Sequence, residues 1–252
     1  MRYITGFVLL LLIAAGCGNK PQPITSASEQ FKYAKQLYDK NKSFKAQVAF
    51  ENLIYTYPGN SAIDTAQYYL GMCYFNQKEY GIAAGEFKRL LSAYPQSEFT
   101  DDAQFQVGMC HYKMSPKYQL DQQETYLALD EFRYLIVNYP GSPYRELAAA
   151  KIKELENKLA KKKFKAGILY LKMGNYESAL TYFKYVRDNY SATDWAIQAF
   201  YYTGEAQMKL GRYEEALTTF DNFLIGFSDH EFASKAKKKI EQITEKNKSS
   251  EN

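Results

Sequence analysis

Few side chains in this chain of 252 residues have both the type and the spacing that chemistry requires. The sequence holds two His, His111 and His230, and no cluster of Cys and His at metal-ligand spacing. His111 occupies a packing position of a helical pattern and His230 precedes a predicted helix, so we interpret neither as a base or a ligand. The neighbouring carboxylates Asp101 and Asp102 open a predicted helix, where negative charge is favoured. We therefore predict no catalytic residue, no metal site, no cofactor and a protein that is not an enzyme.

Cys17 is the one residue for which we expect a covalent modification. It follows a positively charged start and an unbroken apolar run over 7–15, the layout of a secretory signal peptide, too short to span a bilayer. The residues before Cys17 resemble a bacterial lipobox, although Ala14 stands where a lipobox usually carries Leu. By this resemblance, residues 1–16 are a lipoprotein signal peptide, Cys17 carries lipid such as palmitate, and Gly18 favours delivery to the outer membrane. Ordinary secretion, with Cys17 lost or free, is the alternative.

Five sets of residues share one spacing. A small residue is followed twelve positions later by Ala, then four later by Phe, then eight later by Pro or Ser, and only the third set departs from the count, by eight inserted residues near 115–121. This is the 34-residue tetratricopeptide pattern, in which small residues let two helices of a pair approach closely. The sets are Ala34/Ala46/Phe50/Pro58, Gly71/Ala83/Phe87/Pro95, Gly108/Ala128/Phe132/Pro140, Gly167/Ala179/Phe183/Ser191 and Gly204/Ala216/Phe220/Ser228.

The predicted fold is all-α, a right-handed α-solenoid of five tetratricopeptide repeats with a C-terminal capping helix. Apolar residues continue at helical spacing after the third repeat with no breaker before Gly174, so we predict one long helix over 143–173, whose second half begins repeat four. The expected divisions are 17–26 for the lipidated Cys and a flexible tether, 27–142 for repeats one to three, 143–230 for the long helix and repeats four and five, and 231–252 for the capping helix and tail.

Composition agrees with a helical protein outside the cytoplasm. The formal net charge of +4 is too mild to indicate nucleic-acid binding, and hydrophobic residues make up 46% of the chain. Cys73 and Cys110 occupy equivalent positions of adjacent repeats, about 8–10 Å apart, whereas a disulfide needs Cα atoms within about 7 Å. We interpret both as small buried hydrophobic residues. The lysine-rich stretch over 158–165 could meet anionic lipid or an acidic partner, but a solvated helix face is the simpler interpretation.

The first helices of the repeats carry the candidate binding residues, because in such arrays they line the concave surface. Position five is aromatic in all five repeats, and a second row follows two turns later. We expect a trough for extended apolar or aromatic peptides, unless these rings pack between repeats. The predicted substrate-peptide residues are Phe31, Tyr38, Tyr68, Met72, Phe75, Phe105, Met109 and Tyr112, and the predicted partner-binding residues are Phe164, Leu171, Arg187, Tyr201 and Met208.

The combination of lipobox, tether, five repeats, an insertion in the third and a long helix into the fourth resembles the BamD family, outer-membrane assembly lipoproteins of Gram-negative bacteria. Local resemblances are the Tyr-Pro stops over 94–97 and 139–142 and the run over 153–174. The resemblance implies a lipid-anchored scaffold on the periplasmic face of the outer membrane. Its implied partners are the periplasmic domains of a BamA-like insertase, met by repeats four and five, other assembly lipoproteins, and unfolded outer-membrane proteins, met by the N-terminal repeats.

Two other functions remain open at this point. One is a different periplasmic tetratricopeptide lipoprotein that coordinates cell-wall or envelope processes, which would have the same fold. The other is an envelope enzyme on a helical-repeat scaffold, which would need a catalytic domain of its own, and no stretch of about 100 residues lies outside the repeats.

Overall fold

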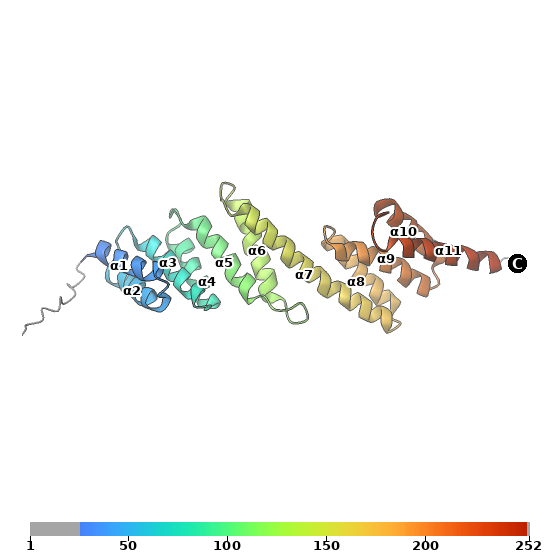
Figure 1. Cartoon of the computed structure of the whole chain (residues 1–252), viewed down its shortest axis with the longest axis horizontal. Helices are drawn as coiled ribbons and strands as arrows, with labels where there is room; N and C mark the ends of the chain where they lie inside the picture. The colour runs from blue at the N-terminus through green and yellow to red at the C-terminus, as the bar shows by residue number, and fades with distance from the viewer. Residues whose placement is uncertain (1–25, 251–252) are drawn as a thin grey trace, which may run out of the picture.

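The computed structural model describes residues 26–250, which form eleven α-helices and no strand. The helices follow one another along a single long axis, with the first pair at one end and the last helix at the other (Figure 1). Cys17, the predicted signal peptide, most of the predicted tether and the last two residues lie outside the described residues. The helices are α1 (Ala27–Asp39), α2 (Ser43–Thr56), α3 (Ile63–Asn76), α4 (Tyr80–Ala93), α5 (Thr100–Met114), α6 (Gln123–Asn138), α7 (Arg145–Lys172), α8 (Tyr176–Asn189), α9 (Asp194–Lys209), α10 (Tyr213–Gly226) and α11 (Ala233–Ser250).

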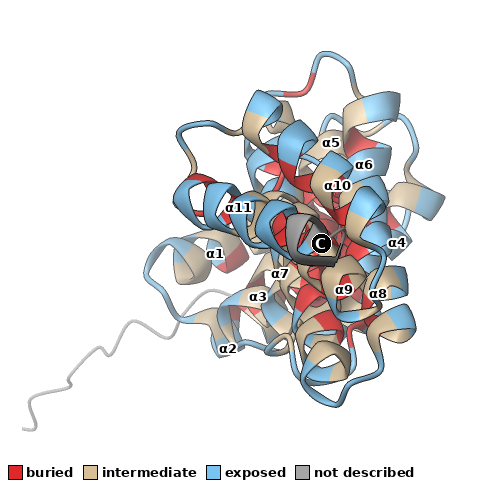
Figure 2. Cartoon of the chain, turned by 90° about the vertical axis from the view of Figure 1, so that its right-hand side faces the viewer, coloured by how far each residue is buried: buried red, intermediate tan, exposed pale blue. Residues whose placement is uncertain are grey.

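The helices pair and stack as the residue spacing predicts, which confirms an all-α solenoid. Each helix packs on the next one along the chain, and α7 also contacts α9. Seen along the long axis, buried residues lie between the helices and exposed residues on the outside (Figure 2). The Phe of each set is completely buried, as is its Ala, so each repeat contributes one ring and one methyl group to a continuous core. These residues are Phe50, Phe87, Phe132, Phe183 and Phe220, with Ala46, Ala83, Ala128, Ala179 and Ala216.

The turn inside a helix pair places one residue in left-handed backbone conformation. Gly174 and Gly211 have φ of 79° and 77°, a conformation that glycine adopts without steric cost. Asn41 and Lys78 hold the same place in the first two pairs, with φ of 56° and 67°. The third pair instead has a longer connection, residues 115–122, which is the insertion found in the sequence.

Helix α7 joins the two halves of the molecule. It runs unbroken for 28 residues, and its buried face carries Leu155 and Leu159 between the third and fourth helix pairs. One core cluster extends from Phe105 on α5 through these leucines to Ala199 on α9. The two halves therefore share apolar packing across α7.

Candidate functional site

The His and Asp side chains considered in the sequence as candidate catalytic groups make structural contacts with other side chains. His111 is buried, with Nδ1 2.8 Å from Oε2 of Glu124, and its Nε2 has no partner. Asp102 lies in the first turn of α5, as predicted for a helix-start acid, and accepts a hydrogen bond of 2.6 Å from the hydroxyl of Tyr144. This bond raises the pKa of Tyr144 to about 12. His230 lies 3.2 Å from Asp194, far along the chain from His111, so the two imidazoles form separate contacts.

Metal-binding clusters and membrane-spanning helices are both absent from the part of the chain that the structure describes. No group of three or more His, Cys, Asp or Glu side chains in residues 26–250 is placed to hold a metal ion. Within the same range, every helix is too short or too polar to cross a bilayer.

The aromatic row at position five is not an open trough. Four of its rings are buried, with exposures of 9% for Tyr68, 8% for Phe105, 2% for Phe164 and 3% for Tyr201. The expectation that these four rings are available to a peptide or partner is therefore wrong, and the alternative that they pack between repeats holds for them.

The physical reason is an aromatic residue at the entrance of the following repeat. Each buried ring lies against this residue, with ring centroids 4.6–5.3 Å apart. Before α3 the corresponding residue is Ala62, so Phe31 keeps one side free and is only half-buried. The four pairs are Tyr68–Phe99, Phe105–Tyr144, Phe164–Trp195 and Tyr201–Phe232.

The other predicted substrate residues are half-buried rather than freely exposed. The rings of Tyr38 and Tyr69 are 5.1 Å apart, and those of Phe75 and Tyr80 are 5.2 Å apart. The hydroxyl of Tyr112 donates a hydrogen bond of 2.5 Å to Glu154. Part of this row reaches the surface, but each member already has a neighbour. The half-buried members are Phe31, Tyr38, Met72, Phe75, Met109 and Tyr112.

Three of the five predicted partner-binding residues retain accessible surface. Arg187 is half-buried on α8, where its guanidinium carbon lies 4.0 Å from the ring centroid of Phe200, and burial lowers its pKa. Leu171 and Met208 are partly buried at the ends of α7 and α9. Phe164 and Tyr201 are buried in the core, so the predicted partner-binding residues lie partly at the surface and partly in the interior.

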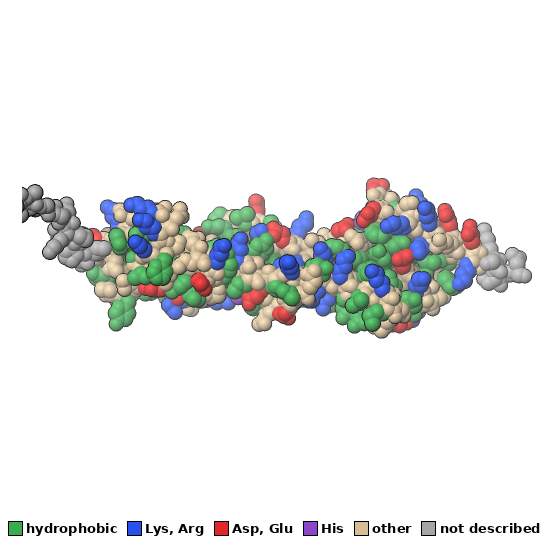
Figure 3. Space-filling view, turned by 60° about the horizontal axis from the view of Figure 1, so that its bottom comes forward, with side chains coloured by type: hydrophobic (Ala, Val, Ile, Leu, Met, Phe, Trp, Pro, Cys, Tyr) green, Lys and Arg blue, Asp and Glu red, His purple; other side chains and the backbone are tan. Residues whose placement is uncertain are grey.

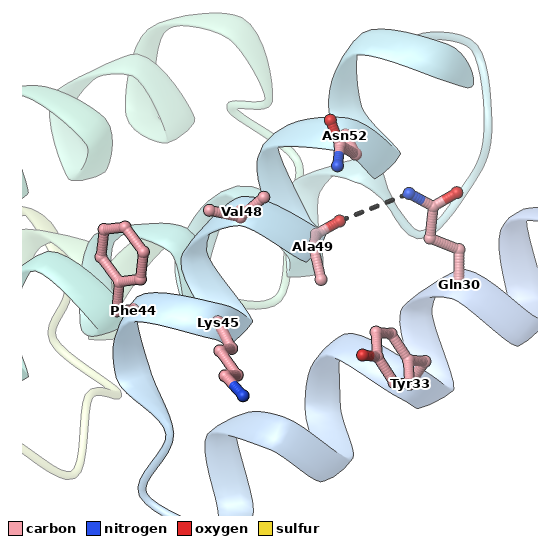
Figure 4. A pocket seen from close by; sticks show the side chains of 7 residues that line it. All are labelled: Gln30, Tyr33, Phe44, Lys45, Val48, Ala49 and Asn52. Atoms are coloured by element: carbon pink, nitrogen blue, oxygen red, sulfur yellow. Dashed lines mark hydrogen bonds between the residues drawn. The ribbon is translucent and has the colours of Figure 1, made fainter.

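An open apolar pocket lies near the N-terminal end of the described stack, which sequence reasoning missed. A pocket of about 510 Å³ opens between α1 and α2 (Figure 4), and hydrophobic side chains protrude at this end of the molecule (Figure 3). The amide of Gln30 donates a hydrogen bond of 3.5 Å to the carbonyl oxygen of Ala49 across it. The lining residues are Gln30, Tyr33, Phe44, Lys45, Val48, Ala49 and Asn52.

The apolar side chains that line this pocket face solvent in the described part of the chain. Phe44 is 67% exposed, Tyr33 47% and Val48 41%. The spacing of Phe44 and Val48 on one face of α2 was the available signal, but helical periodicity does not tell whether an apolar face is buried or exposed.

Comparison with known proteins gives the family. The family model described as YfiO, outer membrane lipoprotein, matches residues 23–219. This chain belongs to the YfiO outer membrane lipoprotein family. A relative from Rickettsia prowazekii (strain Madrid E), named outer membrane protein assembly factor BamD, is 26% identical over 210 residues, which are 82% of this chain and 84% of the relative. The resemblance to BamD found in the sequence is thereby confirmed.

Solved tetratricopeptide structures match the same YfiO-family chain at low similarity. YrrB, a TPR protein with an unusual peptide-binding site, is 21% identical with a TM-score of 0.35, over 84% of this chain and 92% of that one. A tetratricopeptide repeat protein from Parabacteroides merdae is 14% identical with a TM-score of 0.38, over 88% and 74%.

Proposed function

We propose that this chain is a lipid-anchored scaffold of the machinery that assembles β-barrel proteins in the outer membrane. In this proposal, Cys17 carries the lipid and holds the helical stack at the periplasmic face of the membrane, which raises its effective concentration near its partners. The N-terminal end binds unfolded barrel proteins, and the C-terminal half binds a BamA-like insertase and further assembly lipoproteins. Membership in an outer membrane lipoprotein family and the relative named as an assembly factor support this role.

The observation that carries the substrate role is the open pocket between α1 and α2. The side chains of Tyr33, Phe44 and Val48 are exposed around one concave site. An extended segment with aromatic side chains places a ring there and gains the hydrophobic free energy of burying these exposed side chains. Gln30 and Asn52 at its edge supply polar groups for a peptide backbone.

The insertase role is placed on the surface of the C-terminal half around Arg187. Its guanidinium lies over the Phe200 ring, a contact that restrains a planar donor at low entropic cost. This donor is pre-organised and partly desolvated before a partner carboxylate binds. Under these conditions an arginine contributes most to the binding free energy of an interface.

Affinity purification from native membranes, followed by mass spectrometry, tests the insertase role. Deleting repeats four and five should abolish co-purification of the insertase. Arg187→Glu should do the same without truncation, because it reverses the charge at the proposed contact. Lys184→Glu, at an exposed residue on the same helix, is the matched control and should leave the complex intact. Recovery of the insertase with Arg187→Glu at the level of the control would show that the docking assignment is wrong, and recovery of cell-wall enzymes instead would favour the envelope-coordinator alternative.

The anchor is tested by Cys17→Ala, which removes the thiol that lipidation requires. The variant should leave the membrane fraction and lose labelling by palmitate. If the variant fractionates with the outer membrane as the unchanged chain does, the lipid-anchor proposal fails, whatever the outcome for the insertase.

A further inference from the structure

One face of α7 carries ammonium groups that have no carboxylate partner. Lys158, Lys161 and Lys165 recur at intervals of three and four residues, so they lie along the same side of the helix. Among residues 26–250, no carboxylate oxygen lies within the 4.0 Å of an ion pair from these three ammonium nitrogens. Like charges at this spacing on a helix repel one another and slightly destabilise it.

Two aromatic rings flank these lysines. The Nζ of Lys161 is 4.9 Å from the ring centroid of Tyr118 and 5.6 Å from that of Trp195, and the Nζ of Lys165 is also 5.6 Å from the Trp195 centroid. Tyr118 belongs to the insertion of the third repeat and Trp195 to the first turn of α9. We call Tyr118, Lys158, Lys161, Lys165 and Trp195 the lysine–tryptophan surface.

The insertion is fixed against α7 by hydrogen bonds. The ammonium of Lys158 donates to Oγ of Ser115 at 2.7 Å, and that of Lys162 donates to the carbonyl oxygen of Leu120 at 2.7 Å. Within the insertion, the amide of Gln122 donates to the carbonyl oxygen of Lys117 at 2.9 Å. The loop that carries Tyr118 is therefore held in place, and the eight inserted residues help to build this surface.

The carboxylates of Glu154 and Asp194 are bound by side chains other than these three lysines. Glu154 accepts a bond of 2.8 Å from Lys151 on its own helix. Asp194, next to Trp195 in the chain, accepts bonds from His230 and from Gln198. Burial lowers the pKa of Lys158, only partly offset by the charge of Glu154. The positive charge of this face is thus left for a group outside the chain.

We propose that the lysine–tryptophan surface binds an acidic, extended segment of a partner protein. Lys161 and Lys165 are about 6 Å apart along the helix axis, close to the roughly 6.6 Å between alternate residues of an extended chain. Carboxylates at alternate positions of such a segment can therefore meet successive lysines. The rings of Tyr118 and Trp195 offer apolar contact to the side chains on either side.

A peptide fits this surface better than a membrane does. Lys161 lies between two rings, and Lys158 is half-buried beside Ser115, so their ammonium groups do not reach a common outer plane. A flat array of lipid headgroups would contact Lys165 first, whereas a single carboxylate side chain can enter beside a ring. The proposal does not depend on the assigned insertase or barrel-substrate roles.

The test is a binding titration with the full chain in a non-ionic detergent. The probe is a fluorescein-labelled peptide of alternating Glu and Ser, and its neutral counterpart has Gln in place of Glu. We expect the acidic peptide to bind and Lys161→Gln/Lys165→Gln to weaken it at least about fivefold. Lys153→Gln/Lys163→Gln removes the same charge from other faces of α7 and should change the affinity by less than about twofold.

Further variants separate charge from structure. Lys161→Arg/Lys165→Arg keeps both charges and should retain binding. Lys165→Gln alone changes an exposed residue, so it replaces the double variant in the test if the double variant unfolds. It should weaken binding of the acidic peptide by about two- to fivefold.

Four results would overturn the proposal. The first three are the absence of binding to the acidic peptide, equal binding of the Gln peptide, and equal weakening by the control pair. The fourth is that the chain binds anionic phosphatidylglycerol vesicles through Lys161 and Lys165 but does not bind the peptide. The last result would assign the surface to lipid.

Discussion

The ring of Phe87 on α4 lies so close to Gly71 on α3 that a Cβ on the glycine would be 2.6 Å from its Cε1 atom. Phe87 is completely buried, so the ring has no free space into which to withdraw. The two residues stand sixteen positions apart in the repeat spacing, and the same contact recurs in three later repeats. There the added Cβ would be 2.6–2.7 Å from the ring. These pairs are Gly108–Phe132, Gly167–Phe183 and Gly204–Phe220.

The Gly71–Phe87 contact predicts a destabilising methyl group. Gly71→Ala should lower the free energy of unfolding by about 1–3 kcal/mol, because overpacking outweighs the better helix propensity of Ala. Gly85→Ala, in the middle of α4 with no atom near the added Cβ, is the control and should raise it by up to about 1 kcal/mol. Urea unfolding followed by circular dichroism measures both. Equal effects at the two glycines would contradict the packing argument.

Lys78 is a position where glycine should stabilise the chain. Its φ of 67° is left-handed, a conformation that costs a side-chain-bearing residue roughly 1–2 kcal/mol, whereas Gly211 holds the corresponding turn without that cost. Glycine has a larger chain entropy in the unfolded state, which offsets part of this gain. Lys78→Gly should therefore raise the unfolding free energy by about 0.5–1 kcal/mol. Gly211→Ala should lower it by a similar amount. A loss of stability in Lys78→Gly would show that contacts of the lysine outweigh the backbone strain.

Cys73 and Cys110 should make stability depend on alkaline pH. Both are free and buried, as expected from the sequence, and burial raises the pKa of each thiol to about 12. An unfolded thiol has a pKa of about 8.5, so the unfolded state releases its protons first, and stability is lost as pH rises above 8.5. Between pH 8.5 and 9.5 the loss should be about 1 kcal/mol per thiol. Urea unfolding at the two pH values measures it, and Cys73→Ala/Cys110→Ala should show a shallower decline.

Leu155 is expected to couple the two halves of the stack. It is completely buried where α7 passes between the third and fourth helix pairs, so Leu155→Ala should cost about 2–5 kcal/mol. Leu169→Ala, at an exposed position of the same helix, should cost less than about 1 kcal/mol. Hydrogen exchange should become faster on α6 and α8 in the Leu155 variant. Unchanged protection there would mean that the halves are stabilised independently.

Phe44 allows binding and folding to be separated. Because its side chain is largely exposed, Phe44→Ser should change the unfolding free energy by no more than about 0.5 kcal/mol. It should weaken the binding of an aromatic peptide from an unfolded barrel protein by about fivefold or more, since the pocket loses its most exposed ring. Tyr55→Ser, at an exposed residue of α2 outside the pocket lining, should bind as the unchanged chain does. Equal affinity of the Phe44 and Tyr55 variants would place the substrate elsewhere.

Local spacing was sufficient to predict the helices and the pairing within each repeat. The small residue, Ala and Phe of one set lie within a few turns of each other, so their burial follows from geometry inside a single helix pair. The sequence also supplied the long helix that the structure has as α7, because no breaking residue stands before Gly174. The predictions about Cys17 and the tether concern residues outside the described range and remain predictions.

The exposure of the aromatic residues was decided only by tertiary structure. Tyr68 is sealed because Phe99, thirty-one residues later, packs on its face, while Phe31 stays half-open because Ala62 offers no ring. Helical periodicity reports which side of a helix is apolar, but burial depends on what the next repeat brings against that side. By itself, the sequence determined a solenoid of paired helices. The placement of its open surfaces, between α1 and α2 and along α7, depended on which side chains the neighbouring helices cover.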